Sequence, residues 1–190
     1  MQQFWYNHAI LRRDAMSIIY LDLETKCLAD EVGGWDYIDR LELAVAVTYN
    51  TARGGFAHYT EDSVGALIDE LSQADLVVGF NLLRFDYTVL RPYTERDLHE
   101  LPTLDILQHL YRRLGHRVKL DSCARATLGV TKSADGVQSV QWFRAGHIDK
   151  VIRYCEQDVD IVRQLHEFGR THKCIYITDG RLRRPVKVNW

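Results

Sequence analysis

Hydrophobic residues in the first half of the chain follow patterns typical of β-strands. The segment SIIYLDLET, starting at Ser17, is apolar and β-branched, and LELAVAVTYN, ending at Asn50, has the same character. A shorter strand is predicted over 55–59, after turn residues, and DLVVGF at 75–80 predicts a fourth, buried strand. The first three strands can pair in sequence order as a meander.

Helix-like spacing of apolar residues alternates with these strands and dominates the second half of the chain. We expect helices over 61–72, 82–90, 103–114, 121–127 and 148–168. Thr60 or Asp62 is expected to cap the first helix, and Gly169 to close the last one. The tail CIYITDGRLRRPVKVNW predicts a β-hairpin, with Asp179 and Gly180 in its tight turn.

This order of elements predicts one α/β domain in which a mixed β-sheet is flanked by α-helices. A length of 190 residues suits a single domain. We expect the domain over 16–170, with the C-terminal hairpin over 171–190 appended to it. Because Met16 directly precedes the first strand, residues 1–15 are interpreted as an N-terminal extension. The glycine-rich phosphate loops of nucleotide-binding folds are absent from the sequence.

Composition narrows the class of protein further. Hydrophobic residues make up 46% and charged residues 26%, the sequence has neither a membrane-spanning run nor a signal-peptide pattern, and the 4 cysteines are scattered. We therefore expect a cytoplasmic protein with no membrane partner. Charge is segregated: 14–105 holds 18 acidic and 6 basic residues, whereas 106–190 holds 8 acidic and 16 basic residues. This asymmetry indicates separate surfaces for cations and for phosphates, or else a mosaic that mixes on folding.

Four acids occupy positions where the pattern calls for apolar side chains. Alternation along the first strand places Asp22 and Glu24 on the same face, within a segment that is otherwise buried. Asp86 lies on the apolar stripe of the second predicted helix. Asp158 lies on a stripe of the long helix, with Tyr154 one turn before it.

Carboxylates near a core cost several kcal/mol unless they are paired or bind a metal. If the four converge, a divalent cation is their natural counter-ion, and oxygen ligands favour magnesium or manganese. Each acid also has an ordinary alternative. Asp22 and Glu24 could cap the loop that follows their strand. Glu24 could also pair with Lys26, Asp86 with Arg91, and Asp158 with Arg153 or Arg163.

Three motifs that carry these acids resemble the DEDD family of 3′–5′ exonucleases, in its tyrosine (DEDDy) subclass. They are YLDLETK with Asp22 and Glu24, GFNLLRFDYTVL with Asp86, and YCEQD with Tyr154 and Asp158. VKLDSCARATLG is similar to a segment of prokaryotic stand-alone or helicase-associated members. The resemblance implies a ribonuclease-H-like fold and a partner that is the 3′ end of single-stranded DNA or RNA, with a helicase as a further candidate partner.

The resemblance also implies roles for individual residues. Asp22, Glu24 and Asp158 would hold one of two Mg²⁺ or Mn²⁺ ions, Asp22 would bridge to the second, and Asp86 would help through water. Tyr154, expected at the edge of the site, would orient the attacking water. Asn81 and Phe85 are candidates for contacting the terminal nucleotide. The activity expected is metal-dependent exonucleolytic hydrolysis of phosphodiesters. The alternatives are a non-catalytic nucleic-acid-binding module with the same fold and, more remotely, a PIN-type nuclease.

Other residues receive simpler interpretations. Two basic groups could follow a phosphate backbone: Arg112, Arg113, Arg117 and Lys119, and on the hairpin Arg181, Arg183, Arg184 and Lys187. Asp105 is interpreted as a helix-start acid. His166 and His172 are expected at the surface or at a helix end.

Overall fold

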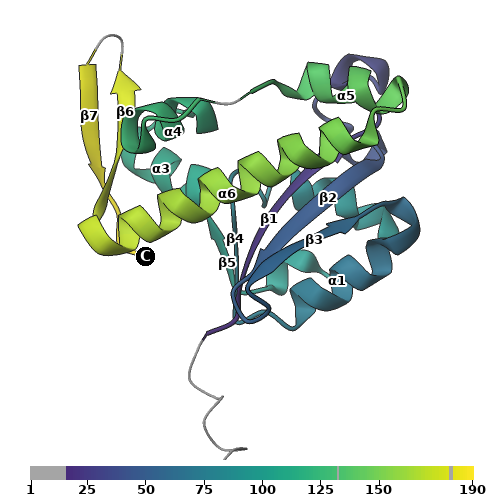
Figure 1. Cartoon of the computed structure of the whole chain (residues 1–190), viewed down its shortest axis with the longest axis horizontal. Helices are drawn as coiled ribbons and strands as arrows, with labels where there is room; N and C mark the ends of the chain where they lie inside the picture. Colours follow the sequence, from purple (N-terminus) through teal and green to yellow (C-terminus); the bar gives the residue numbers. More distant parts are fainter. Residues whose placement is uncertain (1–15, 132, 180–181) are drawn as a thin grey trace, which may run out of the picture.

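The computed structural model describes residues 16–131, 133–179 and 182–190. A five-stranded sheet with helices on both faces forms the body of the protein, and a two-stranded hairpin lies beyond one end of it (Figure 1). The expected N-terminal extension (1–15) and the glycine of the predicted hairpin turn lie outside the described residues. The fold class is as predicted.

Strands in the sheet run in the order β3-β2-β1-β4-β5. Their bounds are β1 Ile18–Thr25, β2 Leu43–Asn50, β3 Gly55–Tyr59, β4 Leu76–Gly79 and β5 Thr103–Asp105. β1, β2 and β3 pair antiparallel as the predicted meander, whereas β4 pairs parallel with β1 and β5 parallel with β4. β1 is therefore the central strand of a mixed sheet, with a neighbour on each side.

Six α-helices surround this sheet in the described part of the chain. They are α1 Val64–Ser72, α2 Asp86–Leu90, α3 Ile106–Leu114, α4 Leu120–Leu128, α5 Gly136–Arg144 and α6 Ile148–His172. α6 crosses the face of the sheet diagonally, with α5 near its start and the hairpin of β6 (Cys174–Asp179) and β7 (Leu182–Lys187) near its end (Figure 1).

Two helix predictions were wrong at their starts, and Asp105 explains both. The segment predicted as helix over 103–114 begins instead as strand β5, and Asp105 is the N-cap of α3, accepting a hydrogen bond from Gln108 N at 3.1 Å. The helix predicted from Leu82 begins only at Asp86. The carboxylate of Asp105 also accepts from the backbone N–H groups of Asn81 and Leu83, and so holds 81–85 as a loop. The prediction of Asp105 as a helix-start acid is confirmed.

The prediction that Gly169 closes the long helix was wrong. α6 continues to His172, and Lys173 caps its end with φ +56°. The glycine instead makes room for an aromatic ring: a Cβ at this position would lie 2.5 Å from the indole nitrogen of Trp190. That nitrogen donates a hydrogen bond to the carbonyl oxygen of His166 at 3.0 Å. Helix α5 was not predicted at all; Asp135 caps it by accepting from Gln138 N.

The alternating side chains of β1 contribute to two hydrophobic cores. Ile19, Leu21 and Leu23 pack against α1 and α2, whereas Ile18 and Tyr20 face α3, α4 and α6. The prediction that His166 lies at the surface or at a helix end was wrong: it is 2% exposed, and its Nδ1 lies 2.9 Å from the hydroxyl of Tyr20.

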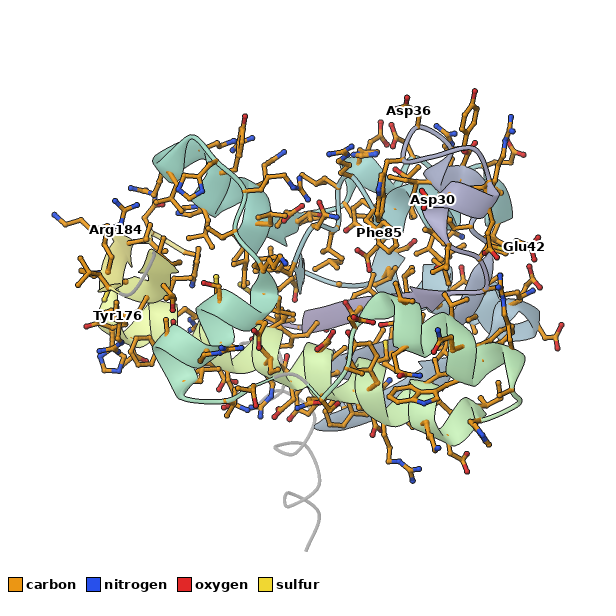
Figure 2. All side chains as sticks on the ribbon, turned by 90° about the horizontal axis from the view of Figure 1, so that it is seen from above. Asp30, Asp36, Glu42, Phe85, Tyr176 and Arg184 are labelled. Atoms are coloured by element: carbon orange, nitrogen blue, oxygen red, sulfur yellow. The ribbon has the colours of Figure 1, made fainter. Side chains whose placement is uncertain are left out.

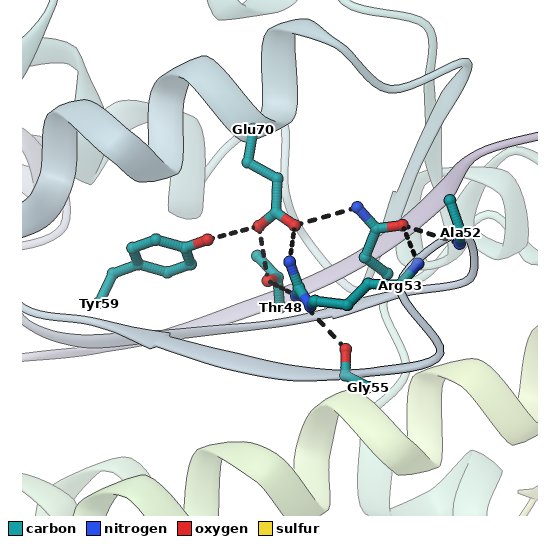
Figure 3. Close-up of polar contacts among 7 residues, drawn as sticks. Thr48, Ala52, Arg53, Gly55, Tyr59 and Glu70 are labelled. Atoms are coloured by element: carbon teal, nitrogen blue, oxygen red, sulfur yellow. Dashed lines mark hydrogen bonds and ion pairs between the residues drawn. The ribbon is translucent and has the colours of Figure 1, made fainter.

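A polar network fixes α1 to the strands beneath it (Figure 3). The carboxylate of Glu70 accepts hydrogen bonds from Thr48, Asn50, Arg53 and Tyr59, at 2.6 to 3.0 Å. Glu70 is half-buried, and burial alone would raise its pKa, but these four hydrogen bonds outweigh burial and lower the pKa.

No helix within 16–131, 133–179 or 182–190 is long and apolar enough to span a membrane.

Candidate active site

Strand β1 presents two of the four predicted acids on one face of the sheet. Asp22 pairs with Val47 and Glu24 with Val45 of β2, and the register shifts immediately after Glu24. Tyr20, two residues before Asp22, belongs to the core beneath α6. Because residues two apart share a face, Asp22 and Glu24 also point toward α6.

Helix α6 supplies the third acid. Oxygen atoms of Asp22, Glu24 and Asp158 all lie within 4.8 Å of one another, and these residues form a group that could hold a metal ion. Glu24 is 8% exposed and Asp158 is 2% exposed, so both carboxylates lie against the protein interior. The sequence predicted that Asp22, Glu24, Asp86 and Asp158 converge, and the structure brings three of the four into one group.

Asp86, the fourth acid, lies behind this group. It is 2% exposed, and burial together with the charges of Asp22, Asp105 and Glu24 raises the pKa of Asp86 well above its ordinary value. Its Oδ1 atom is buried and has no hydrogen-bond partner among the described residues. Asp86 is near enough to feel the other acids, but the cavity that they line does not include its side chain.

The three converging acids open into a cavity of about 500 Å³. Its walls come from β1, from the loop after β1, from the start of α5 and from α6. Tyr154 lines it but is only 3% exposed, and its ring packs edge-on against Trp142 at 6.2 Å. The phenol therefore forms part of the wall and does not stand at the rim, where the sequence analysis placed it.

Aromatic side chains line the opening of the same cavity. Phe85, a predicted substrate-contacting residue, lies here, in the same part of the molecule as Asp30 (Figure 2). Its ring centroid is 6.4 Å from that of Trp35, which is 61% exposed. Trp35 was not predicted from the sequence. The available signal was a tryptophan that follows Gly33 and Gly34, outside every predicted element.

Cys155, also missed, contacts the acid group directly. Its Sγ lies 3.2 Å from the carbonyl oxygen and 3.4 Å from Oδ2 of Asp22. Burial, followed by the charges of Asp22 and Glu24, raises the pKa of this thiol well above its ordinary value. The thiol therefore stays protonated and acts as a hydrogen-bond donor.

Asn81, the other predicted substrate-contacting residue, is not in this cavity. It has φ +77° and lines a neighbouring cavity, where its Oδ1 accepts a hydrogen bond from Nη2 of Arg117 at 2.8 Å. Asn81 and Phe85, the two ends of loop 81–85, therefore line two different, neighbouring cavities.

Three of the cations considered as ordinary counter-ions pair with other acids. Lys26 binds Glu61 and Glu42, Arg91 binds Asp39, and Arg163 binds Asp160 and Glu167. The cations that could have paired with Glu24 and Asp86, namely Lys26 and Arg91, therefore form ion pairs with other acids.

The donor set fits a hard divalent cation. Three carboxylates provide oxygen ligands only, which magnesium and manganese prefer. Negative charges this close repel one another, and a cation bound among them would remove that repulsion. The pKa of Asp86 is raised first by its burial and then by the charge of Asp22, one of these carboxylates.

Comparison with known proteins agrees with this architecture. A family model of the RNase H superfamily matches residues 19–168, a range that contains all four acids and Tyr154. No curated protein gives a match. The match covers well over half of the chain and runs from β1 through most of α6. The chain therefore belongs to the RNase H superfamily.

Proposed function

We propose that this protein is a metal-dependent 3′–5′ exonuclease that hydrolyses single-stranded DNA or RNA. Its superfamily suggests a nuclease-like hydrolase with a nucleic acid substrate. The observation that carries the finer proposal is the convergence of Asp22, Glu24 and Asp158 within 4.8 Å, on the strand and helix that bear the DEDD-like motifs. Tyr154, which lines the same cavity, supports assignment to the tyrosine subclass.

In this proposal Asp22, Glu24 and Asp158 would hold two divalent ions, and Asp86, which is buried next to them, would contribute through water. When bound, such ions polarise the phosphodiester and supply a nucleophile at neutral pH. Tyr154 holds the attacking water in line by a hydrogen bond. Burial of Tyr154 beside Trp142 suits this role, because a packed ring keeps its hydroxyl in one place.

The terminal nucleotide occupies the cavity between the acids and the aromatic pair of Trp35 and Phe85. A volume of about 500 Å³ is within the range of small-ligand sites. Aromatic faces bind any of the bases by stacking, so they hold a strand end without reading its sequence.

Stepwise shortening of a 5′-labelled single strand tests the proposal. We expect a ladder of products with Mg²⁺ or Mn²⁺ and none with EDTA. Asp22→Ala and Asp158→Ala should abolish cutting. Asp160→Ala is the matched control, because Asp160 lies on the same helix but pairs with Arg163 on the surface. Internal cuts would contradict the exonuclease assignment, and binding without cutting under every metal condition would favour the non-catalytic module.

A further inference from the structure

A second cavity, of about 310 Å³, lies on the other side of loop 81–85. Asn81, Leu83 and Arg84 of the loop line it, and so do Tyr111 of α3 and Arg117, which precedes α4. The next residue of the loop, Phe85, lines the acid cavity. Because Arg84 and Phe85 are adjacent in sequence, one short stretch of backbone forms a wall of both cavities.

The second cavity has a positive electrostatic character. Arg84 and Arg117 are both exposed, and the one acid among its lining residues is Asp105. The carboxylate of Asp105 already accepts three backbone N–H groups, from Asn81, Leu83 and Gln108, at 2.9 to 3.1 Å. The carboxylate of Asp105 is therefore already engaged, and two guanidinium groups against one carboxylate make the lining favourable to an anionic ligand.

An aromatic ring completes the cavity. Tyr111 is 49% exposed on α3, which is unusual for a large side chain next to a core. Guanidinium groups beside an exposed ring are the combination that binds single-stranded nucleic acid, by phosphate contact and base stacking.

The basic residues of the hairpin are less suited to this task. The guanidinium of Arg183 stacks on Tyr176 at 3.5 Å and donates to the carbonyl oxygen of Ala126, so it is used in packing. Arg184 lies on the hairpin at one end of the molecule, whereas Phe85 lies in the other half (Figure 2).

We propose that the second cavity is a subsite for the upstream part of the strand whose 3′ end occupies the acid cavity, an inference that rests on the proposed function. Arg84 and Arg117 each bind a phosphodiester, and Tyr111 stacks on a base. Arg117 also holds the side-chain oxygen of Asn81, which leaves the amide N–H₂ of Asn81 as a donor toward the same strand.

Binding of a 5′-fluorescein single-stranded decanucleotide in EDTA, followed by anisotropy, tests this subsite without cleavage. The Arg84→Ala/Arg117→Ala protein should bind more weakly, and the slope of log affinity against log salt should fall by about 1.4, which corresponds to two lost phosphate contacts. The matched control is Arg153→Ala/Arg170→Ala, which removes the same charge from exposed positions of α6 outside the cavity. Equal slopes for the two double variants would overturn the proposal.

The affinities of two Tyr111 variants test whether its ring stacks on a base. Tyr111→Ala should weaken binding about fivefold or more, whereas Tyr111→Phe should stay close to wild type because the ring is retained. Equal affinities for the two variants would remove Tyr111 from the subsite. Thermal melting of each variant shows whether it still folds. Arg117→Lys, which keeps the charge, is a further variant that distinguishes a lost contact from lost folding.

The cleavage assay keeps the two proposals distinct. Cleavage together with equal slopes overturns the subsite and leaves the nuclease intact. A slope difference without cleavage overturns the nuclease, and the cavity then stands as a strand-binding site.

Discussion

The thiol of Cys155 lies 3.4 Å from Oδ2 of Asp22 and 3.2 Å from the carbonyl oxygen of the same residue. Both contacts cross from α6 to β1, so the helix that carries Asp158 also fixes the orientation of Asp22. A neutral donor suits this place, because a cation here would compete with a bound metal for the carboxylate.

Cys155→Ala should lower kcat about fivefold with little change in KM, because one hydrogen bond that orients Asp22 is lost. Cys155→Ser retains a donor and should stay within about twofold of wild type. Cys123→Ala removes an equally buried thiol from α4 and controls for packing. A kcat for Cys155→Ala equal to that of Cys123→Ala would show that the thiol does not position the carboxylate.

Asp86→Asn should stabilise the metal-free protein, by on the order of 1 kcal/mol or 2–4 °C in Tm. The pKa of Asp86 is raised by burial and by Asp22, so above its unfolded pKa the folded state holds the extra proton and stability falls as pH rises. In EDTA, Asp86 should therefore contribute a falling slope of Tm against pH above about 4, and Asp86→Asn should remove that contribution, so that the Tm difference between variant and wild type widens as pH rises. Asp36→Asn, at an exposed site, should leave the slope unchanged.

Glu70→Ala should destabilise the fold by about 2–3 kcal/mol in urea denaturation, because it leaves the buried hydroxyl of Thr48 and its neighbours without their acceptor. Asp69→Ala is the matched control on the same helix. Asp69 pairs with Arg96 in an exposed position, and its removal should change stability by about 0.5 kcal/mol or less. Similar losses for both variants would mean that the network contributes little.

His166 should make the protein sensitive to acid. Burial, aided by the charge of Arg170, lowers the pKa of His166 to about 4, so between that value and its ordinary pKa of 6.5 the unfolded chain binds more protons than the folded one. The contribution of His166 to stability is complete above pH 6.5 and falls toward pH 4, by up to about 3 kcal/mol. His166→Gln should flatten this part of the profile, whereas His172→Gln, exposed on the same helix, should not. An unchanged profile in His166→Gln would assign the acid sensitivity to other groups.

The sequence predicted four of the five strands of the sheet because each has a clear apolar pattern bounded by turns. It also located the acids, since Asp22, Asp86 and Asp158 stand out within apolar stripes. The family resemblance and the cost of burying charge predicted that the acids converge, which holds for Asp22, Glu24 and Asp158 but not for Asp86, whose side chain does not line the cavity.

What escaped prediction depends on contacts between distant segments. Strand β5 has three residues, too few for a period, and runs directly into α3. Gly169 resembles a helix end until Trp190 is seen to pack against it. Cys155 and Trp35 acquire their positions only through the approach of α6 to β1 and of one loop to another, which no local pattern encodes.

Because β1 is the central strand of the sheet, inserting a residue into it would displace Asp22 and Glu24. Both edges of the strand are paired, and its two faces belong to different cores. One extra residue before Asp22 would send both acids to the α1 side and replace them with leucines. The β2–β3 turn, which is exposed at 51–54, could absorb the same insertion at little cost. Variation in length among relatives should therefore gather at that turn, while the spacing within β1 stays constant.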